Sequence, residues 1–343
     1  MPEADTPEPE IVTGTGRPDE AGFEEELRPR NLEGFVGQSQ LVANLRVYLE
    51  AARRRGEPLD HVLFCGPPGL GKTTLARIVA EEMGAKLHAA NAPAVSKAAD
   101  LASLLTQLAS GDVLFLDEVH RLPPALEEYL YSAMEDFVID INLDPGHLAG
   151  RTVRIDLPRF TLVAATTKEG ALQAAFRDRF GIVERLKYYE PEDLERIVQR
   201  SARILGLEVE ALAGTTLSRR SRGTPRVVNR FLRRVRDVAT VEGSGRVTAA
   251  MVDRILEMLE VDELGLTWID RRILEILQKH HGRPVGLNTI AVSLAEDKST
   301  IEDVYEPYLI QQNLIQKTAS GRILTDRGFS LIFRLGGGAA PKS

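Results

Sequence analysis

Two short segments of the sequence contain residue types whose spacing could support chemistry on phosphate groups. The first reads GPPGLGKTT at 66–74, and the second reads DEVH at 117–120, directly after the apolar run 113–116. Glycines would let backbone N–H groups approach phosphate oxygens, Lys72 would reach the β- and γ-phosphates, and the Thr73 hydroxyl would bind Mg²⁺. Together the segments predict a site that hydrolyses a nucleoside triphosphate. A glycine-rich turn before an ordinary helix is the alternative, and the acid pair counts against it.

The acid pair would divide two tasks between its members. Phosphoryl transfer needs from the protein mainly positioning and charge stabilisation. Asp117 is the candidate Mg²⁺ ligand, and Glu118 is the candidate base that orients the attacking water. The alternative is that both acids cap a helix that follows Arg121.

Two later segments could complete this site. Thr167 follows the apolar run 160–165, at the carboxyl end of a strand, where open α/β sheets bind ligands. Its hydroxyl could bond to the γ-phosphate or to the attacking water, although such threonines also cap strand ends. The segment RDRFG at 177–181 could supply an arginine to the phosphates of a neighbouring subunit in a ring. Taken alone, it would equally suit a solvated surface.

A cluster of arginines precedes and enters a predicted helix. Eight arginines lie between Arg219 and Arg236 with no acid among them, and the helix is expected to start near Thr224, with Pro225 in its first turn. Arg226 could touch the nucleotide from a helical lid. The alternative is the polar face of an ordinary amphipathic helix.

Short apolar strands alternate with helical patterns over the segment that contains the phosphate motifs. This alternation predicts an α/β domain with a parallel sheet covered by helices. A hairpin of two alternating runs at 138–157 would interrupt it. The expected strands are 62–65, 86–90, 113–116, 160–165 and 182–186.

The remainder of the chain predicts two smaller domains. Residues 191–260 have a helical pattern, and residues from 262 onward show three helices and a hairpin, the arrangement of a winged helix. The third of these helices (299–312) carries acids that would repel phosphates. Contact with DNA would therefore be mainly to backbone phosphates, through cations around that helix. These cations are Lys298, Lys317 and Arg322. A structural or protein-binding domain is the alternative.

Length and composition agree with a multidomain intracellular protein. A chain of 343 residues exceeds what one core usually organises, and its single cysteine, Cys65, favours a reducing compartment. Without a long apolar run or a signal peptide, the protein is expected to be cytoplasmic, with no membrane association. Residues 1–26 carry a charge of −8 out of a total of −7, which leaves about +1 for the remainder and permits DNA binding. This acidic leader is predicted to be disordered. The histidines show no metal-binding spacing.

From Leu27 to Arg327 the sequence resembles the RuvB family, the bacterial AAA+ motors of Holliday-junction branch migration. Many ATPases share the phosphate loop, but clamp loaders lack the winged-helix ending. The segments that carry the resemblance are 27–29, 59–61, 66–74, 117–121, 133–137, 177–183, 222–226 and 302–312.

The resemblance implies roles for residues at matching positions. Leu27, Arg28 and Tyr189 would surround the adenine. Arg179 would act on the ATP of a neighbouring subunit, and Arg226 would sense the nucleotide from the lid. The implied catalytic residues are Lys72, Asp117, Glu118, Thr167, Arg179 and Arg226, with Thr73 and Asp117 at Mg²⁺. The implied ATP/ADP-binding residues are Leu27, Arg28, Gly69, Gly71, Lys72, Thr73, Thr74, Glu135, Asp136, Phe137, Arg179, Tyr189 and Arg226.

The resemblance also implies partners and a domain plan. The protein would act on DNA four-way junctions as a homohexamer, bind RuvA through the 138–157 hairpin and join RuvC in a resolvasome, in recombination, DNA repair and the SOS response. Lys317 and Ser320 depart from the family, which often has arginines there. The expected parts are a disordered leader (1–26), an ATPase domain (27–190), a lid (191–260), a winged helix (262–335) and a disordered tail (336–343).

Two other functions are compatible with the same motifs. One is a clamp-loader-like ATPase, which would form pentamers and bind a sliding clamp. The other is an ATP-switched DNA-binding regulator, which would hydrolyse ATP slowly and without regard to DNA.

Overall fold

The computed structural model describes residues 18–142, 152–243 and 245–335. Contacts divide them into two units, one of residues 28–187 and one of residues 18–27 with 188–335, and each is described by itself.

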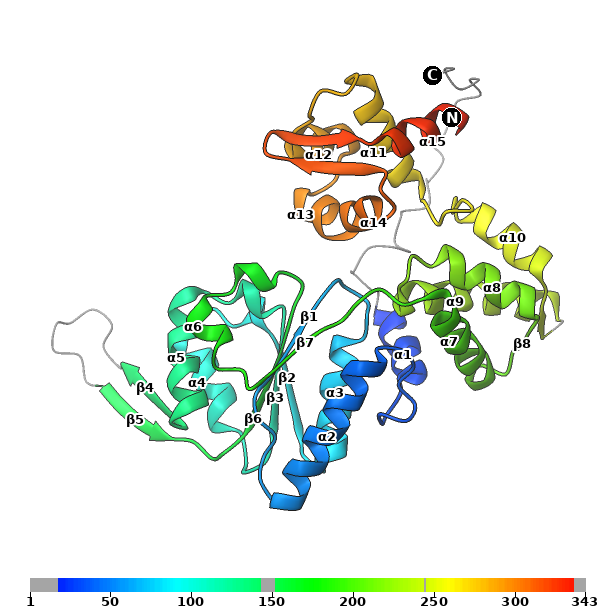
Figure 1. Ribbon diagram of the computed structural model, residues 1–343. Coiled ribbons are helices and arrows are strands. Elements are labelled where there is room, and N and C mark those ends of the chain that lie inside the picture. The colour runs from blue at the N-terminus through cyan, green and yellow to red at the C-terminus, as the bar shows by residue number, and fades with distance from the viewer. Residues whose placement is uncertain (1–17, 143–151, 244, 336–343) are drawn as a thin grey trace. The chain divides into compact units, whose positions relative to one another are not determined.

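The centre of the first unit is a five-stranded parallel sheet with the order β2-β3-β6-β1-β7 (Figure 1). Strands β1, β3 and β6 consist mainly of apolar residues, and almost all of their residues are buried, as expected for a parallel sheet covered on both faces. The α/β prediction is confirmed. The strands are β1 (Val62–Cys65), β2 (Leu87–Asn91), β3 (Val113–Asp117), β6 (Thr161–Thr166) and β7 (Ile182–Arg185).

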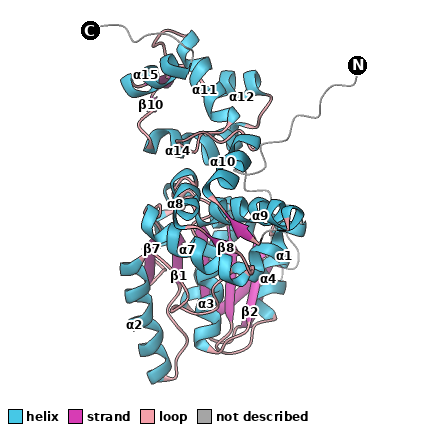
Figure 2. Cartoon of the chain, turned by 90° about the vertical axis from the view of Figure 1, so that its right-hand side faces the viewer, coloured by secondary structure: helices cyan, strands magenta, loops and turns pink. Residues whose placement is uncertain are grey.

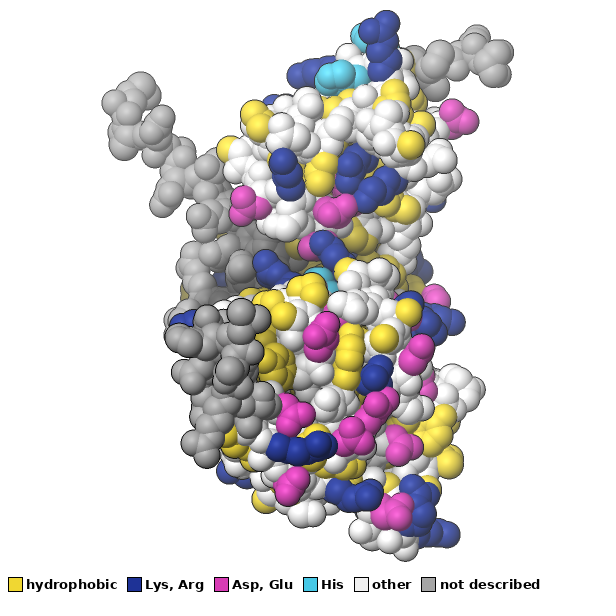
Figure 3. All heavy atoms as spheres, turned by 90° about the vertical axis from the view of Figure 1, so that its left-hand side faces the viewer, with side chains coloured by type: hydrophobic (Ala, Val, Ile, Leu, Met, Phe, Trp, Pro, Cys, Tyr) yellow, Lys and Arg dark blue, Asp and Glu magenta, His cyan; other side chains and the backbone are white. Residues whose placement is uncertain are grey.

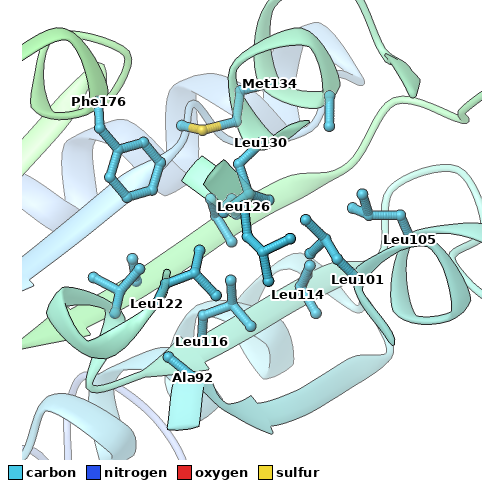
Figure 4. Close-up of a cluster of buried hydrophobic side chains, with 14 of the residues drawn as sticks. Ala92, Leu101, Leu105, Leu114, Leu116, Leu122, Leu126, Leu130, Met134 and Phe176 are labelled. Atoms are coloured by element: carbon cyan, nitrogen blue, oxygen red, sulfur yellow. The ribbon is translucent and has the colours of Figure 1, made fainter. Parts of the chain in front are cut away.

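Helices cover both faces of this sheet. Helices α2 and α3 lie on one side and α4 and α5 on the other (Figure 1). On the second side, Leu101 and Leu105 of α4 and Leu126 and Leu130 of α5 pack on Leu114 and Leu116 of β3 (Figure 4). The helices are α2 (Ser39–Arg55), α3 (Lys72–Met83), α4 (Ala98–Thr106), α5 (Pro124–Glu135) and α6 (Ala174–Arg177), with 3₁₀ turns at Ala92–Ala94, Val119–Arg121 and Glu169–Ala171.

The predicted hairpin is present as the antiparallel pair β4 (Val138–Asn142) and β5 (Thr152–Asp156). Its expected turn lies outside the described residues. Ile139 is fully buried in the core under α5, whereas Val153 of β5 is exposed. The base of the hairpin is therefore part of the domain core.

The lid belongs to the second unit and is helical, as expected. Helix α9 starts at Pro225 with Thr224 as its cap residue, which confirms the sequence signal. The elements are α7 (Pro191–Ile204), α8 (Ala211–Arg220), α9 (Pro225–Glu242) and α10 (Ala249–Met258), with a small parallel pair of β8 (Glu208–Val209) and β9 (Arg246–Val247).

The acidic leader ends in a helix, α1 (Pro18–Leu27), so the prediction of disorder is wrong from Pro18 onward. Phe23 supplies the reason, because its buried ring lies 4.7 Å from the guanidinium of Arg236 and 5.7 Å from that of Arg233. Burial of an aromatic ring and cation–π contacts with α9 stabilise a helix that its polar composition alone does not predict.

The last part of the chain is a winged helix (Figure 2). Its elements are α11 (Trp268–Lys279), α12 (Leu287–Leu294), α13 (Lys298–Thr300), a π-helical turn (Ile301–Tyr305), α14 (Glu306–Gln311), β10 (Ile315–Thr318), β11 (Gly321–Leu324) and α15 (Asp326–Leu335). The third predicted helix is thus divided by the π turn. Pro307 has no backbone N–H to donate, which accounts for the irregular hydrogen bonding before it.

A buried ion pair joins the lid to the winged helix. The Arg222 guanidinium pairs with Asp270, donates from Nε to the Gly265 carbonyl (2.7 Å) and lies 4.9 Å from the ring of Tyr308. Arg222 and Asp270 are both buried, and Arg222 has a positive φ of 59°. Because unpairing a buried charge is costly, this junction holds the two parts together.

Candidate nucleotide site

The phosphate loop connects β1 to α3 in the conformation that its glycines permit. Gly66, Gly69 and Gly71 all have positive φ, and a Cβ at Gly66 would lie 2.6 Å from the Leu186 carbonyl oxygen. Lys72 begins α3, and its Nζ donates to the carbonyls of Gly66 (2.7 Å) and Pro67 (2.8 Å). The N-terminus of α3 has no side-chain cap, which suits it to an anion.

The two predicted metal ligands lie together beside this loop. Thr73 Oγ1 donates to Asp117 Oδ2 at 3.3 Å, although the residues come from α3 and from the end of β3. A hydroxyl and a carboxylate at the N-terminus of a helix are ligands that Mg²⁺ uses in nucleotide sites. The residues present therefore fit Mg²⁺ bound with a nucleotide.

Glu118 follows Asp117 in a left-handed conformation, with φ of 53°. Its backbone N–H donates to Asp117 Oδ1 (2.9 Å), and its Oε2 accepts from the Thr167 hydroxyl (3.3 Å). Burial, and secondarily the charge of Asp117, raise the pKa of the Glu118 carboxyl above its usual value. A higher pKa suits a carboxylate that must take a proton from water.

His120 is a residue that the sequence patterns missed. It lies in the 3₁₀ turn after Glu118, and its Nδ1 is 3.3 Å from Glu118 Oε2 and 3.0 Å from Thr166 Oγ1. The available signal was its position two residues after the candidate base, since a tight turn returns that side chain toward the strand end. Within the described residues, no group of three or more metal-binding side chains is found.

Arg179 lies near the amino-terminal ends of the sheet strands, whereas its own phosphate loop lies near their carboxyl ends. The loop follows the carboxyl end of β1, whereas Gly181 packs on Asp60 and Ile182 N–H donates to the His61 carbonyl, both before β1 begins. Because β1 has four residues, the two ends of the strand are about 13 Å apart. Arg179 contacts Glu135 (3.3 Å) and the Tyr131 ring (4.2 Å).

The segment 135–137 lies near the same amino-terminal ends of the strands. His61 Nε2 is 3.1 Å from the carbonyl of Met134, and the Phe137 ring packs edge-on to Phe160 at 6.0 Å. The structure therefore does not bring these three predicted nucleotide ligands to their own phosphate loop. Of the three, Glu135 pairs with Arg179 instead.

The second unit holds the other predicted nucleotide ligands, while Arg28 begins the first. Leu27 is buried, and its carbonyl accepts from Arg200 Nη1 (2.7 Å). Tyr189 N–H donates to the Gly223 carbonyl (2.9 Å). Arg226 projects from the first turn of α9, and its Nε lies 3.7 Å from Glu24 of α1.

The three predicted DNA contacts have different environments. Lys298 is exposed on α13. Lys317 on β10 has a half-exposed side chain that pairs with Glu302 (2.8 Å). Arg322 on β11 is only 7% exposed and pairs with Glu306 through two hydrogen bonds, of 2.5 and 3.0 Å.

The assignment of Arg322 to DNA is therefore corrected. Lys317 and Arg322 are cross-strand partners, and acids of the preceding helical segment face them. The sequence pattern predicted that these acids would repel phosphates, and instead they pair with the cations of the wing. The pairing buries the Arg322 guanidinium inside the domain, where its hydrogen bonds are directed to Glu306 rather than to a phosphate.

Comparisons with known proteins agree along most of the described chain. Family models match residues 27–186 (Holliday junction DNA helicase RuvB P-loop domain), 189–262 (RuvB AAA lid domain) and 263–332 (RuvB C-terminal winged helix domain). The chain belongs to the RuvB family. Curated RuvB proteins of Rubrobacter xylanophilus and Myxococcus xanthus are each 53% identical, over 94% and 91% of both chains.

Solved structures give the same result for the RuvB fold. The Thermotoga maritima RuvB Holliday junction branch migration motor is 42% identical, with a TM-score of 0.82 over 92% of this chain and 100% of that chain. A point mutant of the same Thermotoga maritima protein is 43% identical, with a TM-score of 0.83 over 92% of this chain and 99% of that chain. The predicted family and the fold of P-loop ATPase, lid and winged helix are confirmed.

On one face of this RuvB family member, the charge distribution does not by itself identify a DNA-binding surface. Basic and acidic side chains are interspersed on the face drawn in Figure 3. None of the described helices is long and apolar enough to cross a membrane.

Proposed function

We propose that this protein is an ATP-driven motor that moves DNA four-way junctions as a homohexameric ring, with RuvA as its partner. The observation that carries the proposal is the division of the site between the two ends of the sheet strands. Thr73, Asp117 and Glu118 lie beside the phosphate loop at the carboxyl ends, while Arg179 lies near the amino-terminal ends. A second subunit would therefore bring its Arg179 to each nucleotide.

The phosphate loop and α3 would hold ATP. Backbone N–H groups at Gly69 and Gly71 and the open N-terminus of α3 bind the phosphates, and Lys72 exchanges its two carbonyl partners for phosphate oxygens. Thr73 and Asp117 would hold Mg²⁺, and Thr74, the next residue of α3, would contact the phosphates. Bound Mg²⁺ would neutralise charge on the phosphate oxygens.

Glu118 would orient the attacking water and accept its proton. Its carboxylate is already hydrogen-bonded by Thr167, so both residues can address one water molecule in front of the γ-phosphate. Arg179 from the next subunit would stabilise the transition state. Glu135, Asp136 and Phe137 would accompany it across the same subunit boundary.

The lid would report the nucleotide to the DNA-binding part. Arg226 lies four residues after Arg222, whose buried pairing with Asp270 ties the start of α9 to the winged helix. A movement of α9 toward the nucleotide would therefore move the winged helix too. Leu27, Arg28 and Tyr189, at the chain segments that join the units, would contact the adenine.

The partners follow from the exposed elements. Lys298 and Lys317 would contact duplex backbone phosphates, and the β4–β5 hairpin would bind RuvA. RuvC would join on the same junction. The setting is recombination and DNA repair in the cytoplasm, where bacterial DNA is found.

Branch migration of a synthetic four-way junction tests the proposal. The protein should convert the junction to duplex products with ATP and Mg²⁺ when RuvA is present, whereas a Lys72→Ala variant should give none. ATP turnover without junction movement would favour an ATP-switched regulator. Five-membered rings that bind a sliding clamp would favour a clamp-loader-like ATPase.

A further inference from the structure

His120 contacts the candidate base and the strand end behind it at the same time. Its side chain is 9% exposed, and its Nδ1 lies 3.3 Å from Glu118 Oε2 and 3.0 Å from Thr166 Oγ1. Thr166 immediately precedes Thr167, whose hydroxyl donates to the same Glu118 oxygen. Two side chains from distant parts of the sequence thus converge on one carboxylate oxygen.

The carboxylate beside Nδ1 bears on which tautomer the ring adopts. An ionised Glu118 carboxylate only accepts hydrogen bonds, so an unprotonated Nδ1 would place a lone pair against it. Thr166 Oγ1 already accepts from the Lys168 backbone N–H (3.0 Å), and it can accept a second hydrogen bond. The Glu118 contact therefore favours a proton on Nδ1, and the Thr166 hydroxyl, which can accept or donate, is compatible with it.

This contact matters because the other donor to Glu118 Oε2 has a second task. That donor is the Thr167 hydroxyl, which the proposed function assigns to the γ-phosphate or the attacking water. A carboxylate that loses Thr167 to the substrate would rotate unless another donor held Oε2. His120 is a buried donor in that place.

We propose that His120 is a positioning residue that fixes the Glu118 carboxylate through its Nδ1–H and leaves the other oxygen to face the attacking water. The inference rests on the proposed ATP hydrolysis and adds a residue to it. Because His120 acts through the base, its loss should slow turnover far more than it weakens nucleotide binding.

The choice of substitution separates hydrogen bonding from packing. An asparagine amide nitrogen takes the place of Nδ1, whereas a glutamine amide reaches toward the place of Nε2. We expect His120→Ala to lower kcat by about 10-fold to 100-fold, as for other partners that orient a catalytic group. His120→Asn should recover more of kcat than His120→Gln, while ADP affinity stays within about two-fold.

A matched control comes from another strand of the same sheet. His88 Nε2 lies 2.9 Å from Asp112 Oδ2, and both side chains are mostly buried. His88→Asn removes a histidine–carboxylate contact of similar burial away from the nucleotide. It should leave kcat unchanged even where it lowers the melting temperature.

Three results would overturn the inference. If His120→Ala keeps the wild-type kcat while Glu118→Gln is inactive, His120 has no positioning role and the proposed function stands. Full turnover by Glu118→Gln would instead remove the proposed base itself. If His120→Ala does not fold, the Asn and Gln variants decide, because equal kcat losses in those two would contradict donation from Nδ1.

Discussion

Arg322 on the second strand of the wing forms a two-hydrogen-bond ion pair with Glu306 at the start of α14, and both side chains are almost completely buried. The pair links the wing to the helix that precedes it. A cation that looked like a DNA contact in the sequence is thus a structural element of its own domain. This finding separates the roles of Arg322 and Lys317, which the strand pairing places opposite each other.

Arg322→Ala should destabilise the winged helix by about 3 kcal/mol, because it leaves the buried Glu306 carboxylate unpaired. Denaturant unfolding of the full chain would measure the loss. The exposed Arg327→Ala is the control and should change stability by less than about 0.5 kcal/mol. An Arg322→Ala variant of normal stability and reduced salt dependence of DNA binding would restore the phosphate assignment.

Lys317→Ala should reduce the slope of log affinity against log salt for duplex DNA by about one, as expected for the loss of one phosphate contact. The effect should be the same on duplexes of different sequence. Gln316→Ala, at the neighbouring exposed position of β10, should keep the slope. Ser320→Arg should increase it by about one. An unchanged slope in Lys317→Ala would mean that other residues hold the DNA.

Glu118→Gln should bind ATP but not hydrolyse it, and it should also stabilise the protein near pH 7. Burial and Asp117 raise the folded-state pKa of Glu118, so the charged form costs stability, and that cost appears as pH rises through this pKa. The gain in unfolding free energy over wild type should therefore shrink in acid. Denaturant unfolding at several pH values without nucleotide tests this, and a gain that grows as pH falls would contradict it.

Arg179→Ala subunits mixed with Lys72→Ala subunits should recover ATPase activity that neither has alone. The reason is that Arg179 and its own phosphate loop lie near opposite ends of the sheet strands. Activity is measured across mixing ratios, with native mass spectrometry to show mixed rings. Arg177→Ala serves as the neighbouring-arginine control and should lose less activity. Mixed rings without any recovery would argue against action between subunits.

Val153→Asp should weaken RuvA binding at least about ten-fold and leave basal ATPase intact. Val153 is 36% exposed on β5, and an apolar side chain on a protruding ribbon suits a partner surface. Val47→Asp, at a more exposed valine on α2, is the control and should bind RuvA normally. Equal RuvA affinity in both variants would move the contact away from this strand.

Several features follow directly from the order of residues. The phosphate loop needs glycines at fixed positions before a helix, and the start of α9 needs only Thr224 and Pro225. Runs of buried apolar residues identify parallel strands because both faces of such a sheet are covered. These signals are local, so one sequence is enough to predict them, and the resemblance to the family extended them to the whole architecture.

The tertiary structure decided the partners and the burial of charged and polar side chains. Arg322 is a wing cation by sequence, and only the packing of β11 on α14 buries it against Glu306. His120 gains a role because a short turn returns it to β6, 46 residues away. Helix α1 forms because Phe23 has arginines of α9 to pack against. Periodicity along the chain describes which face is apolar, but ion pairs and hydrogen bonds between distant segments depend on distances that only the folded chain sets.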